Sequence, residues 1–289
     1  MVSAAKMRGD ANRLNAAKPF GKWVDALGTN SQTVEFIDVS GFPQTNLFVC
    51  FTTDKGLCGG VNSFVSRGMR KIAALMAQEG KTLKVVVSGE KGRGQLQRIV
   101  GDQLVTACTD NMYPATFNSV SAFTNEVLKV DPSEYQSMHF VYNEFKSAIA
   151  YTTMVKTLPT LAGVGVDEPL MNYEFETETK NEVMADLKEY MIASGAFYSA
   201  MENAASEQSA RTSAMEGASK NAGELITSLT LQYNKARQTR ITTELIEIIS
   251  GMVVILAIDF PLSFVSYPPQ FFALLTSLLA GASALEKPK

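Results

Sequence analysis

One long stretch without proline, residues 181–250, constrains this chain more than any other feature. It contains no proline and only three glycines, Gly195, Gly217 and Gly223. Because proline and, to a lesser degree, glycine interrupt helices, the stretch predicts one continuous helix, and we place its end at residue 251. At 1.5 Å per residue, roughly 70 helical residues span on the order of 100 Å, several times the diameter of a small domain. We therefore expect a helix that projects.

Apolar and small side chains recur along this helix at spacings of three, four and seven residues, which is typical of a seam against a partner helix. Residues 1–18 have matching character, and we expect them to form a helix that stops at Lys18 because Pro19 follows. Small residues on both segments favour a narrow antiparallel coiled coil. The seam comprises Val183, Leu187, Tyr190, Phe197, Met201, Ala204, Met215, Ala218, Ala222, Leu225, Leu229, Tyr233 and Ala236, and the small residues are Ala204, Ala205, Ala210, Ala214 and Ala218 facing Ala4, Ala5 and Ala11.

Between the two helices, short apolar runs alternate with helical patterns. The run Asn46–Phe51 has the length of a buried strand, and apolar residues in 61–78 recur at helical spacing. Alternating strands and helices predict a Rossmann-like α/β domain with a parallel sheet over residues 36–160, followed by an acidic loop at 161–180. The other expected elements are a strand at 83–88, helices at 95–100 and 117–130, and a hairpin of strands at 137–145 and 150–158.

Charge and cysteine content exclude several classes of function. The 289 residues are 46% apolar with a formal net charge of -3, so no basic field points to nucleic acid. Cys50, Cys58 and Cys108 match neither a disulfide framework nor a zinc motif. His139 is the only histidine and has no recognisable triad or metal partner, so we expect it to pack or lie on the surface. We expect no catalytic residue, no metal and no cofactor.

Two glycine-rich segments follow predicted strands. Asp54–Gly60 opens a helix, as a phosphate-binding loop does, but it lacks the Gly-Lys-Ser/Thr ending and the Gly-x-Gly-x-x-Gly spacing. We favour a tight turn that contacts a neighbouring subunit, through Asp54, Lys55, Gly56 and Gly59, and a nucleotide site stays open as the alternative. Gly89–Gly94 is interpreted as a second turn, with Lys91 and Arg93 solvated.

Several motifs occur together in one order along the chain. They resemble those of the gamma subunit, the central stalk, of F-type ATP synthases, and the helix, α/β domain, helix layout is similar as well. The resemblance implies a non-catalytic coupling subunit that meets the alpha and beta subunits of the F1 hexamer, the delta and epsilon stalk subunits and the membrane c-ring. The segments are Met1–Lys6, Asp54–Asn62, Ala205–Arg211, Tyr233–Gln238 and Ile241–Gly251.

The same resemblance implies a mechanism and contact residues. An off-axis coiled coil in the bore of the hexamer would force three catalytic sites through different conformations in turn, because contacts move from one beta subunit to the next. Arg237, Gln238 and Thr242 would meet acidic loops of the beta subunits through charge-assisted hydrogen bonds. Tyr173 and Glu176, in the acidic loop, would rest on the rotor ring. The expected location is the matrix side of the mitochondrial inner membrane, peripherally attached, with the bacterial cytoplasmic membrane as the alternative.

The chain departs from the family pattern at both ends. Family members have a further N-terminal segment before the residue that matches Met1, and this chain continues as an apolar extension over residues 252–289. The apolar runs 252–264 and 271–285 are each shorter than the roughly 20 residues of a membrane-spanning helix, so a membrane hairpin is disfavoured. A nucleotide-binding α/β enzyme, a coiled-coil tether and a tail-anchored membrane protein remain the rival interpretations.

Overall fold

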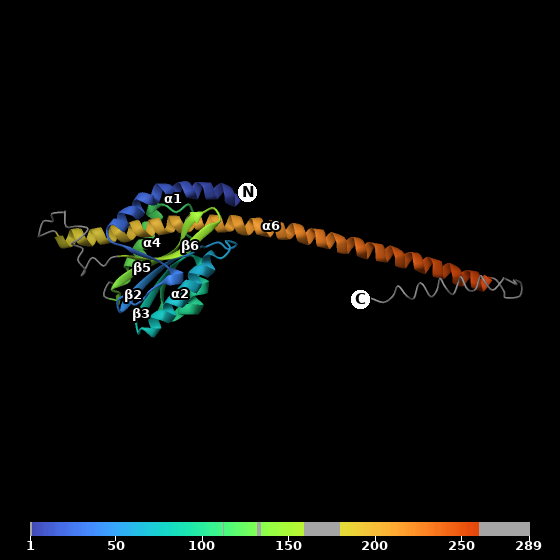
Figure 1. The fold of residues 1–289 in the computed structure, drawn as a ribbon, viewed down its shortest axis with the longest axis horizontal. Coiled ribbons are helices and arrows are strands. Elements are labelled where there is room, and N and C mark those ends of the chain that lie inside the picture. Colours follow the sequence, from blue (N-terminus) through green and yellow to red (C-terminus); the bar gives the residue numbers. More distant parts are fainter. Residues whose placement is uncertain (1, 112, 132–133, 159–179, 260–289) are drawn as a thin grey trace. The chain divides into compact units, whose positions relative to one another are not determined.

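The computed structural model describes residues 2–111, 113–131, 134–158 and 180–259, and Figure 1 shows the order of the elements. Tyr173, Glu176 and all of the acidic loop except Lys180 lie outside these residues, as does the extension beyond Asp259. The chain divides into two compact units, Met1–Asn221 and Ala222–Lys289.

The first unit is built on a mixed sheet. Among the described residues six strands pair in the order β1-β6-β5-β2-β3-β4. The neighbours in β5-β2-β3-β4 run parallel, whereas β5-β6 and β6-β1 are antiparallel. The strands are β1 (Asn30–Thr33), β2 (Thr45–Phe51), β3 (Thr82–Ser88), β4 (Leu104–Cys108), β5 (Ser137–Ser147) and β6 (Ala150–Leu158).

Helices cover both faces of the sheet, which is why β2 is apolar at almost every position. Its side chains alternate, so that Leu47 and Val49 enter one core while Phe48 and Cys50 enter the other. Helices α1, α4 and α6 close the first core, and α2 and α3 close the second. The helices are α1 (Val2–Ala26), α2 (Val61–Gln78), α3 (Glu90–Val100), α4 (Phe117–Leu128) and α6 (Lys180–Asp259), with short 3-10 turns η1 (Val34–Phe36) and η2 (Gly101–Gln103).

The predicted Rossmann-like α/β core and long C-terminal helix are confirmed. Helix α2 has its predicted bounds, and β5 and β6 form the predicted hairpin. The strands β5, β2, β3 and β4 form the expected parallel part of the sheet, the predicted hairpin adds one antiparallel pair, and β1 adds a second that was not predicted. Strands β1 and β4 were not predicted: β1 has the sequence Asn-Ser-Gln-Thr, which carries no apolar alternation.

The predicted ends of the first helix and of the second glycine-rich turn are wrong. Helix α1 continues through Pro19 to Ala26, because Pro19 lies on the exposed side while the following turns pack Phe20, Trp23 and Val24 inward. Packing thereby outweighs the cost of the missing N–H, about 3 kcal/mol. The second glycine-rich segment, Gly89–Gly94, was predicted as a turn, but α3 already begins at Glu90. A methyl group on Gly92 would lie 2.1 Å from Thr52 Oγ1, so close approach explains that glycine.

Helix α1 packs antiparallel on the first part of α6, as predicted, but in a different place. Along α1, Leu14 and Ala17 meet Met201 and Ala205, whereas Trp23 meets Tyr190. The expected alanine pairs at the start of α1 are not the contact: Ala5 and Ala218 are exposed, and Ala210 packs on Cys58 and Val61 instead. Aromatic side chains, including Phe20 against Phe197, thus set the register.

Helix α6 is continuous across all of residues 180–259, and no short helices replace it. The first eight residues of the predicted apolar extension therefore continue this helix, up to Asp259. In the second unit, large apolar side chains of α6 are exposed, among them Leu225 at 60%, Tyr233 at 67% and Ile248 at 70%.

Candidate helix-docking site at the carboxyl edge of the sheet

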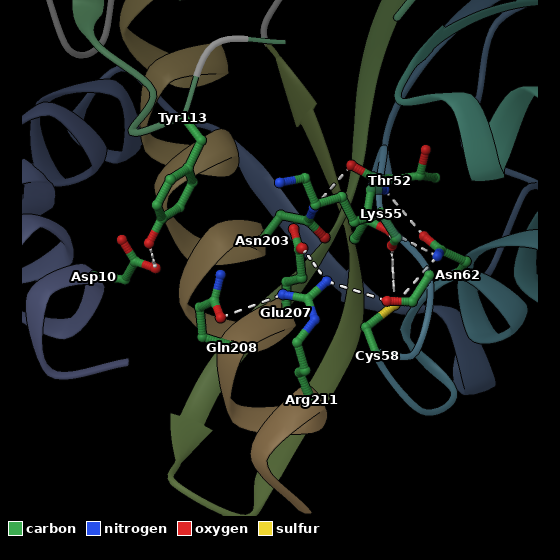
Figure 2. A network of polar contacts seen from close by, with 12 residues as sticks. Asp10, Thr52, Lys55, Cys58, Asn62, Tyr113, Asn203, Glu207, Gln208 and Arg211 are labelled. Atoms are coloured by element: carbon green, nitrogen blue, oxygen red, sulfur yellow. Dashed lines mark hydrogen bonds and ion pairs between the residues drawn. The ribbon is translucent and has the colours of Figure 1, made fainter. Parts of the chain in front are cut away.

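The order of the strands reverses between β2 and β5, because the chain moves from β2 through β3 to β4 and then returns to β5. In open α/β sheets, ligands bind in the crevice at the carboxyl ends of such strands. Here the crevice lies beside Thr52 and Thr53, which follow β2, and Asn143 of β5. Figure 2 shows that side chains of α6 approach this region.

Buried amides join α6 to the crevice. Asn143, which is 0% exposed, donates from Nδ2 to Asn203 Oδ1 of α6 at 3.0 Å, and Asn203 Nδ2 donates to the carbonyl of Thr52 at 3.3 Å. Ser206 Oγ donates to the carbonyl of Asn143 at 2.9 Å, and Thr153 Oγ1 donates to Asn143 Oδ1 at 2.8 Å. Since a buried polar group without a partner is costly, this network specifies one docking position of α6 on the sheet.

The turn after β2 is held by its own polar side chains. Asn62, at the start of α2, accepts from the N–H of Thr53 at 3.0 Å and donates to Thr53 Oγ1 at 2.8 Å. Thr53 Oγ1 in turn donates to the carbonyl of Lys55 at 2.7 Å. Cys58 is buried against Val61 and Ala210. The turn therefore presents a fixed surface, and α6 packs on it at Cys58.

Asp54 ties the turn to two other segments. Its carboxylate accepts from the N–H of Glu90 at 2.9 Å, which caps the start of α3, and from the N–H groups of Asp110 and Asn111 at 3.1 and 3.0 Å. A carboxylate at a helix N-terminus is favoured by the helix dipole and satisfies an unbonded donor. Asp54 is thus a structural anchor of the site.

An ion pair on α6 completes the contact with the turn. Arg211 pairs with Glu207 at 2.5 Å, donates to Gln208 at 3.2 Å and reaches the carbonyl of Gly56 at 3.4 Å. Burial raises the pKa of the Glu207 carboxyl, and Arg211 opposes this by stabilising the charged form. The backbone oxygen of Ala210 would lie 3.6 Å from a methyl group on Gly59, so α6 lies close to the turn.

A small cavity remains beside this network, with a volume of about 150 Å³. Lys6, Lys55, Tyr113 and Glu207 are among its lining residues. Tyr113 donates to Asp10 of α1 at 2.7 Å, and burial together with that carboxylate raises the pKa of Tyr113 to about 12. The cavity is smaller than the roughly 300–1,000 Å³ of typical ligand pockets. The small volume gives the nucleotide interpretation of the turn no support.

The predicted site residues fall in different parts of the chain. We call the turn between β2 and α2, residues 52–60, the docking turn. It contains all four of the predicted turn residues, Asp54, Lys55, Gly56 and Gly59. The residues that carry the network, Asn143, Asn203, Glu207 and Arg211, were not predicted as a site. The available signal was the cluster of polar residues at 206–211 in a helix face otherwise suited to packing.

The predicted beta-subunit contacts, Arg237, Gln238 and Thr242, lie on α6 in the second unit. All three are exposed, and Thr242 Oγ1 donates to the carbonyl of Gln238 at 2.9 Å, one turn away. Nearby Arg240 pairs with Glu244 at 2.9 Å, whereas Arg237 forms no ion pair within the part of the chain that the structure describes. Arg237 is thus a cation available to another polypeptide.

His139 is a packing residue. Its ring lies against Phe42 and Phe48, with centroids 4.3 and 4.6 Å away. Its Nε2 bonds Ser137 Oγ at 2.7 Å and its Nδ1 bonds Thr157 Oγ1 at 2.9 Å. Burial lowers the pKa of His139 to about 3, so the ring is neutral at physiological pH. Full burial separates the Ser137–His139 pair from any substrate.

The described residues offer no candidate for two other kinds of site. They contain no group of three or more His, Cys, Asp or Glu side chains placed to hold a metal ion. None of the described helices combines the length and the hydropathy that a membrane-spanning segment requires.

The chain matches known proteins over most of its length. The family described as ATP synthase matches residues 1–254. The ATP synthase gamma chain of Paramagnetospirillum magneticum is 35% identical, with 87% of this chain and 90% of the relative covered. The mitochondrial ATP synthase subunit gamma of Drosophila melanogaster is 39% identical, with 87% and 82% covered.

Solved structures show the same fold. A chain of the central stalk and c-ring of Tetrahymena thermophila mitochondrial ATP synthase is 28% identical with a TM-score of 0.61, and the match covers 76% of this chain and 96% of that one. A chain of the OSCP, F1 and c-ring assembly of Euglena gracilis mitochondrial ATP synthase has a TM-score of 0.66 at 19% identity, covering 92% and 100%.

Proposed function

Because the chain belongs to the ATP synthase gamma-chain family, we propose that its task is to transmit torque through α6. It is a rotary stalk subunit of an F-type ATP synthase, and it is non-catalytic. The observation that carries the mechanism is the contrast along α6. Asn203 fixes this helix to the sheet and Arg211 fixes it to the turn after β2, whereas apolar side chains further along, such as Leu225 and Ile248, are exposed.

The exposed part of α6 supplies the shaft. Its apolar side chains are a large surface left in water, and such surfaces mark interaction sites. In our proposal they enter the bore formed by the alpha and beta subunits, where the hydrophobic effect retains them. The docking site then acts as the clamp, because torque on α6 must be resisted by a fixed attachment to the α/β domain.

Coupling requires contacts that differ between the states of the hexamer, since a ligand or shaft shifts an equilibrium only by its differential contact energy. Arg237 is the leading candidate for such a contact, supported by Gln238 and Thr242. A guanidinium can form charge-assisted hydrogen bonds with an acidic loop of one beta subunit and exchange them for those of the next. The exposed Lys55 and Gly56 of the docking turn are a second contact with a neighbouring subunit.

The residues expected to contact the c-ring lie outside the described residues. We assign Tyr173 and Glu176 to the contact with the c-ring, and the α/β domain to the contact with the delta and epsilon stalk subunits. Relatives include both bacterial and mitochondrial proteins. We assign the chain to the matrix side of the mitochondrial inner membrane, where F1 is peripherally attached.

Affinity isolation of the tagged full chain, followed by subunit identification and an ATPase assay, tests this function. We expect alpha and beta subunits in stoichiometric amounts, and ATP hydrolysis that depends on proton flow. Isolation of the chain by itself would favour the tether interpretation. Nucleotide-dependent stabilisation of the isolated chain would favour the nucleotide-binding enzyme.

A matched pair of variants tests the role of Arg237. Arg237→Glu should slow or uncouple hydrolysis without dissociating the complex, because it places like charges opposite each other. Arg240→Glu serves as the control, since Arg240 lies one turn away and is already paired with Glu244. Equal turnover and coupling in wild type and Arg237→Glu would remove Arg237 from the mechanism.

A further inference from the structure

The cavity beside the docking turn has features of a binding site that the stalk function does not use. It lies at the carboxyl edge of the parallel strands, next to the point where the strand order reverses, and open α/β sheets bind ligands at such points. Its lining residues come from α1, the docking turn, the segment before α4 and α6, and all of them belong to the first unit. The site is therefore built by this chain alone and is independent of the proposed rotary function.

The size of the cavity limits what it can hold. Roughly 10–15 Å³ suffices for one water molecule, so the volume of about 150 Å³ has room for an ion of several atoms. Ligands the size of a nucleotide occupy pockets of roughly 300–1,000 Å³. The volume therefore fits a small polyatomic ion better than a nucleotide.

A buried amide donor faces the cavity without a partner. Gln208 of α6 is 4% exposed and lines the cavity, and its Oε1 accepts from the guanidinium of Arg211 at 3.2 Å. Because a guanidinium can only donate, this contact fixes Oε1 toward Arg211, and Figure 2 shows Nε2 turned away from it. Nε2 forms no hydrogen bond with any described residue. Since an unsatisfied buried donor is costly, an acceptor inside the cavity would stabilise it.

Two lysine side chains from different segments line the same cavity. Lys6 belongs to α1 and Lys55 to the docking turn, and both are exposed. The Lys6 amine lies 5.2 Å from the centroid of the Tyr113 ring. Neither lysine forms an ion pair within the part of the chain that the structure describes. Both amines are therefore available to an anion.

The carboxylates that line the cavity already have partners. Asp54 accepts four hydrogen bonds from neighbouring segments, and Glu207 is paired with Arg211 at 2.5 Å. The lining contains three cations, Lys6, Lys55 and Arg211, and two carboxylates, so its formal charge is +1. Because Arg211 and both carboxylates are engaged, the amines of Lys6 and Lys55 are the charges without a counterion.

The chemistry of these donors selects a tetrahedral oxyanion. Lysine amines bind phosphate as point charges, and a phosphate has four oxygens that can accept from donors in different directions. A planar carboxylate has only two oxygens for the three donors. We propose that this cavity binds one small oxyanion of the phosphate class, which accepts from the amines of Lys6 and Lys55 and from Nε2 of Gln208. The ion then links α1, the docking turn and α6.

Equilibrium dialysis of the isolated full chain against radiolabelled inorganic phosphate tests this inference, with ionic strength held constant by chloride. The isolated chain is used because catalytic subunits that hydrolyse ATP bind phosphate themselves. We expect one saturable site per chain. Lys6→Gln and Lys55→Gln change exposed side chains, and each should weaken binding at least about tenfold because a charged donor is lost. Absence of saturable binding to the wild-type chain would overturn the inference.

Lys91→Gln is the matched control. Lys91 is exposed and lies close to Gly56, where its Cε would be 3.8 Å from an added methyl group, but it does not line the cavity. Its substitution should leave phosphate binding within about twofold of wild type, since a screened surface charge acts weakly at a distance. Weakening equal to that in Lys55→Gln would indicate diffuse surface attraction and would contradict a defined site.

Gln208→Glu tests the buried donor, because it replaces the amide nitrogen with a carboxylate oxygen of similar size. A chain that unfolds in urea like wild type should then bind no phosphate, and binding retained in such a chain would be evidence against the site. If Gln208→Glu does not fold, the two lysine variants decide. Sulfate should compete with phosphate, whereas ATP at the same concentration should compete less. Stronger competition by ATP would identify a nucleotide site and overturn the inference.

Discussion

Two parts of the single helix α6 differ in how they depart from the usual rule that apolar side chains are buried and polar ones exposed. Over residues 190–211, polar groups such as Asn203, Ser206 and Gln208 are buried, because the sheet and the docking turn surround them. Over residues 222–255, large apolar side chains such as Leu225 and Ile248 are exposed. The contrast teaches that the first part was selected for one fixed position on its own domain, and that the second was selected for a partner polypeptide.

The two parts differ because buried hydrogen bonds specify one position of the helix, whereas apolar contacts only retain it. Buried hydrogen bonds are directional and costly to leave unmade, so they define where and in which register the helix docks. Apolar contact is non-directional and scales with the area buried, so it permits a helix to be held while its contacts change. A shaft that must be clamped at one place and turned at another needs both kinds of surface.

The largest expected difference in unfolding free energy is between substitutions of one buried and one exposed apolar residue of α6. Met201, 5% exposed, packs with Leu14 and Ala17, and Met201→Ala should lower the free energy of unfolding by about 2–5 kcal/mol. Leu229→Ala should change it by less than about 0.5 kcal/mol, since Leu229 is exposed. Urea unfolding of the isolated chain measures both. When incorporation into the complex is measured instead, Leu229→Ala should have the larger effect of the two variants. Equal effects of the two variants in both assays would contradict the difference between the two parts of α6.

A second pair compares asparagines. Asn203→Ala leaves the carbonyl of Thr52 and one donor of Asn143 without their partner, which should cost about 1–3 kcal/mol. Asn221→Ala, on the exposed surface of the same helix, is the control and should be nearly neutral. The melting temperature provides the measurement. A melting temperature for Asn203→Ala equal to that of Asn221→Ala would mean that the amide network does not hold α6.

Two glycines on α6 lie in the buried and the exposed part of the helix. A methyl group on Gly195 would lie 2.9 Å from the ring of Phe140, so Gly195→Ala should destabilise the chain by roughly 1–2 kcal/mol despite the better helix propensity of alanine. Gly217 has no described atom near the corresponding position, and Gly217→Ala should stabilise the helix by about 0.5–1 kcal/mol. Thermal unfolding of the two variants should therefore shift in opposite directions.

The smallest effect concerns pH. Burial raises the pKa of the Glu202 carboxyl, although it accepts hydrogen bonds from Tyr198 at 2.5 Å and from the N–H of Phe145 at 2.8 Å. Since the folded pKa is raised, the folded state binds more protons. The contribution of Glu202 to stability is therefore complete below its usual pKa and is lost as pH rises through the raised value.

Glu202→Gln should flatten the dependence of unfolding free energy on pH over that window. Glu247→Gln, on the exposed part of α6, serves as its control. Urea unfolding at a series of pH values measures the slope for each variant. If the slope of unfolding free energy against pH is the same in Glu202→Gln as in wild type, burial of the Glu202 carboxyl does not cause the pH dependence.

Much of the fold could be predicted because its signals are local. The apolar run that forms β2, the helical spacing of α2 and the absence of proline across α6 each depend on residues close in sequence. The end of α1 could not be predicted, because the packing of Trp23 on Tyr190 outweighs Pro19 only once α6 is in place. Strand β1 was missed for the same reason: its polar residues pair with β6 at an edge.

Predicting the candidate site was harder than predicting the fold. The turn at Asp54–Gly59 was visible as a glycine-rich segment, but its function as a dock for α6 depends on Asn203 and Arg211, which lie far away in sequence. The gathering of cations beside α2 was equally hidden, since Arg98 joins Arg67 and Arg70 only through the packing of α3 beside α2.

Local sequence patterns specify an α/β core and one long helix, because backbone propensity and apolar spacing act over short distances. Tertiary structure alone decided which part of that helix is clamped and which part is exposed, and which cations gather beside α2. Those properties arise from contacts between distant segments, and the energy of such contacts depends on burial and geometry that no local pattern contains.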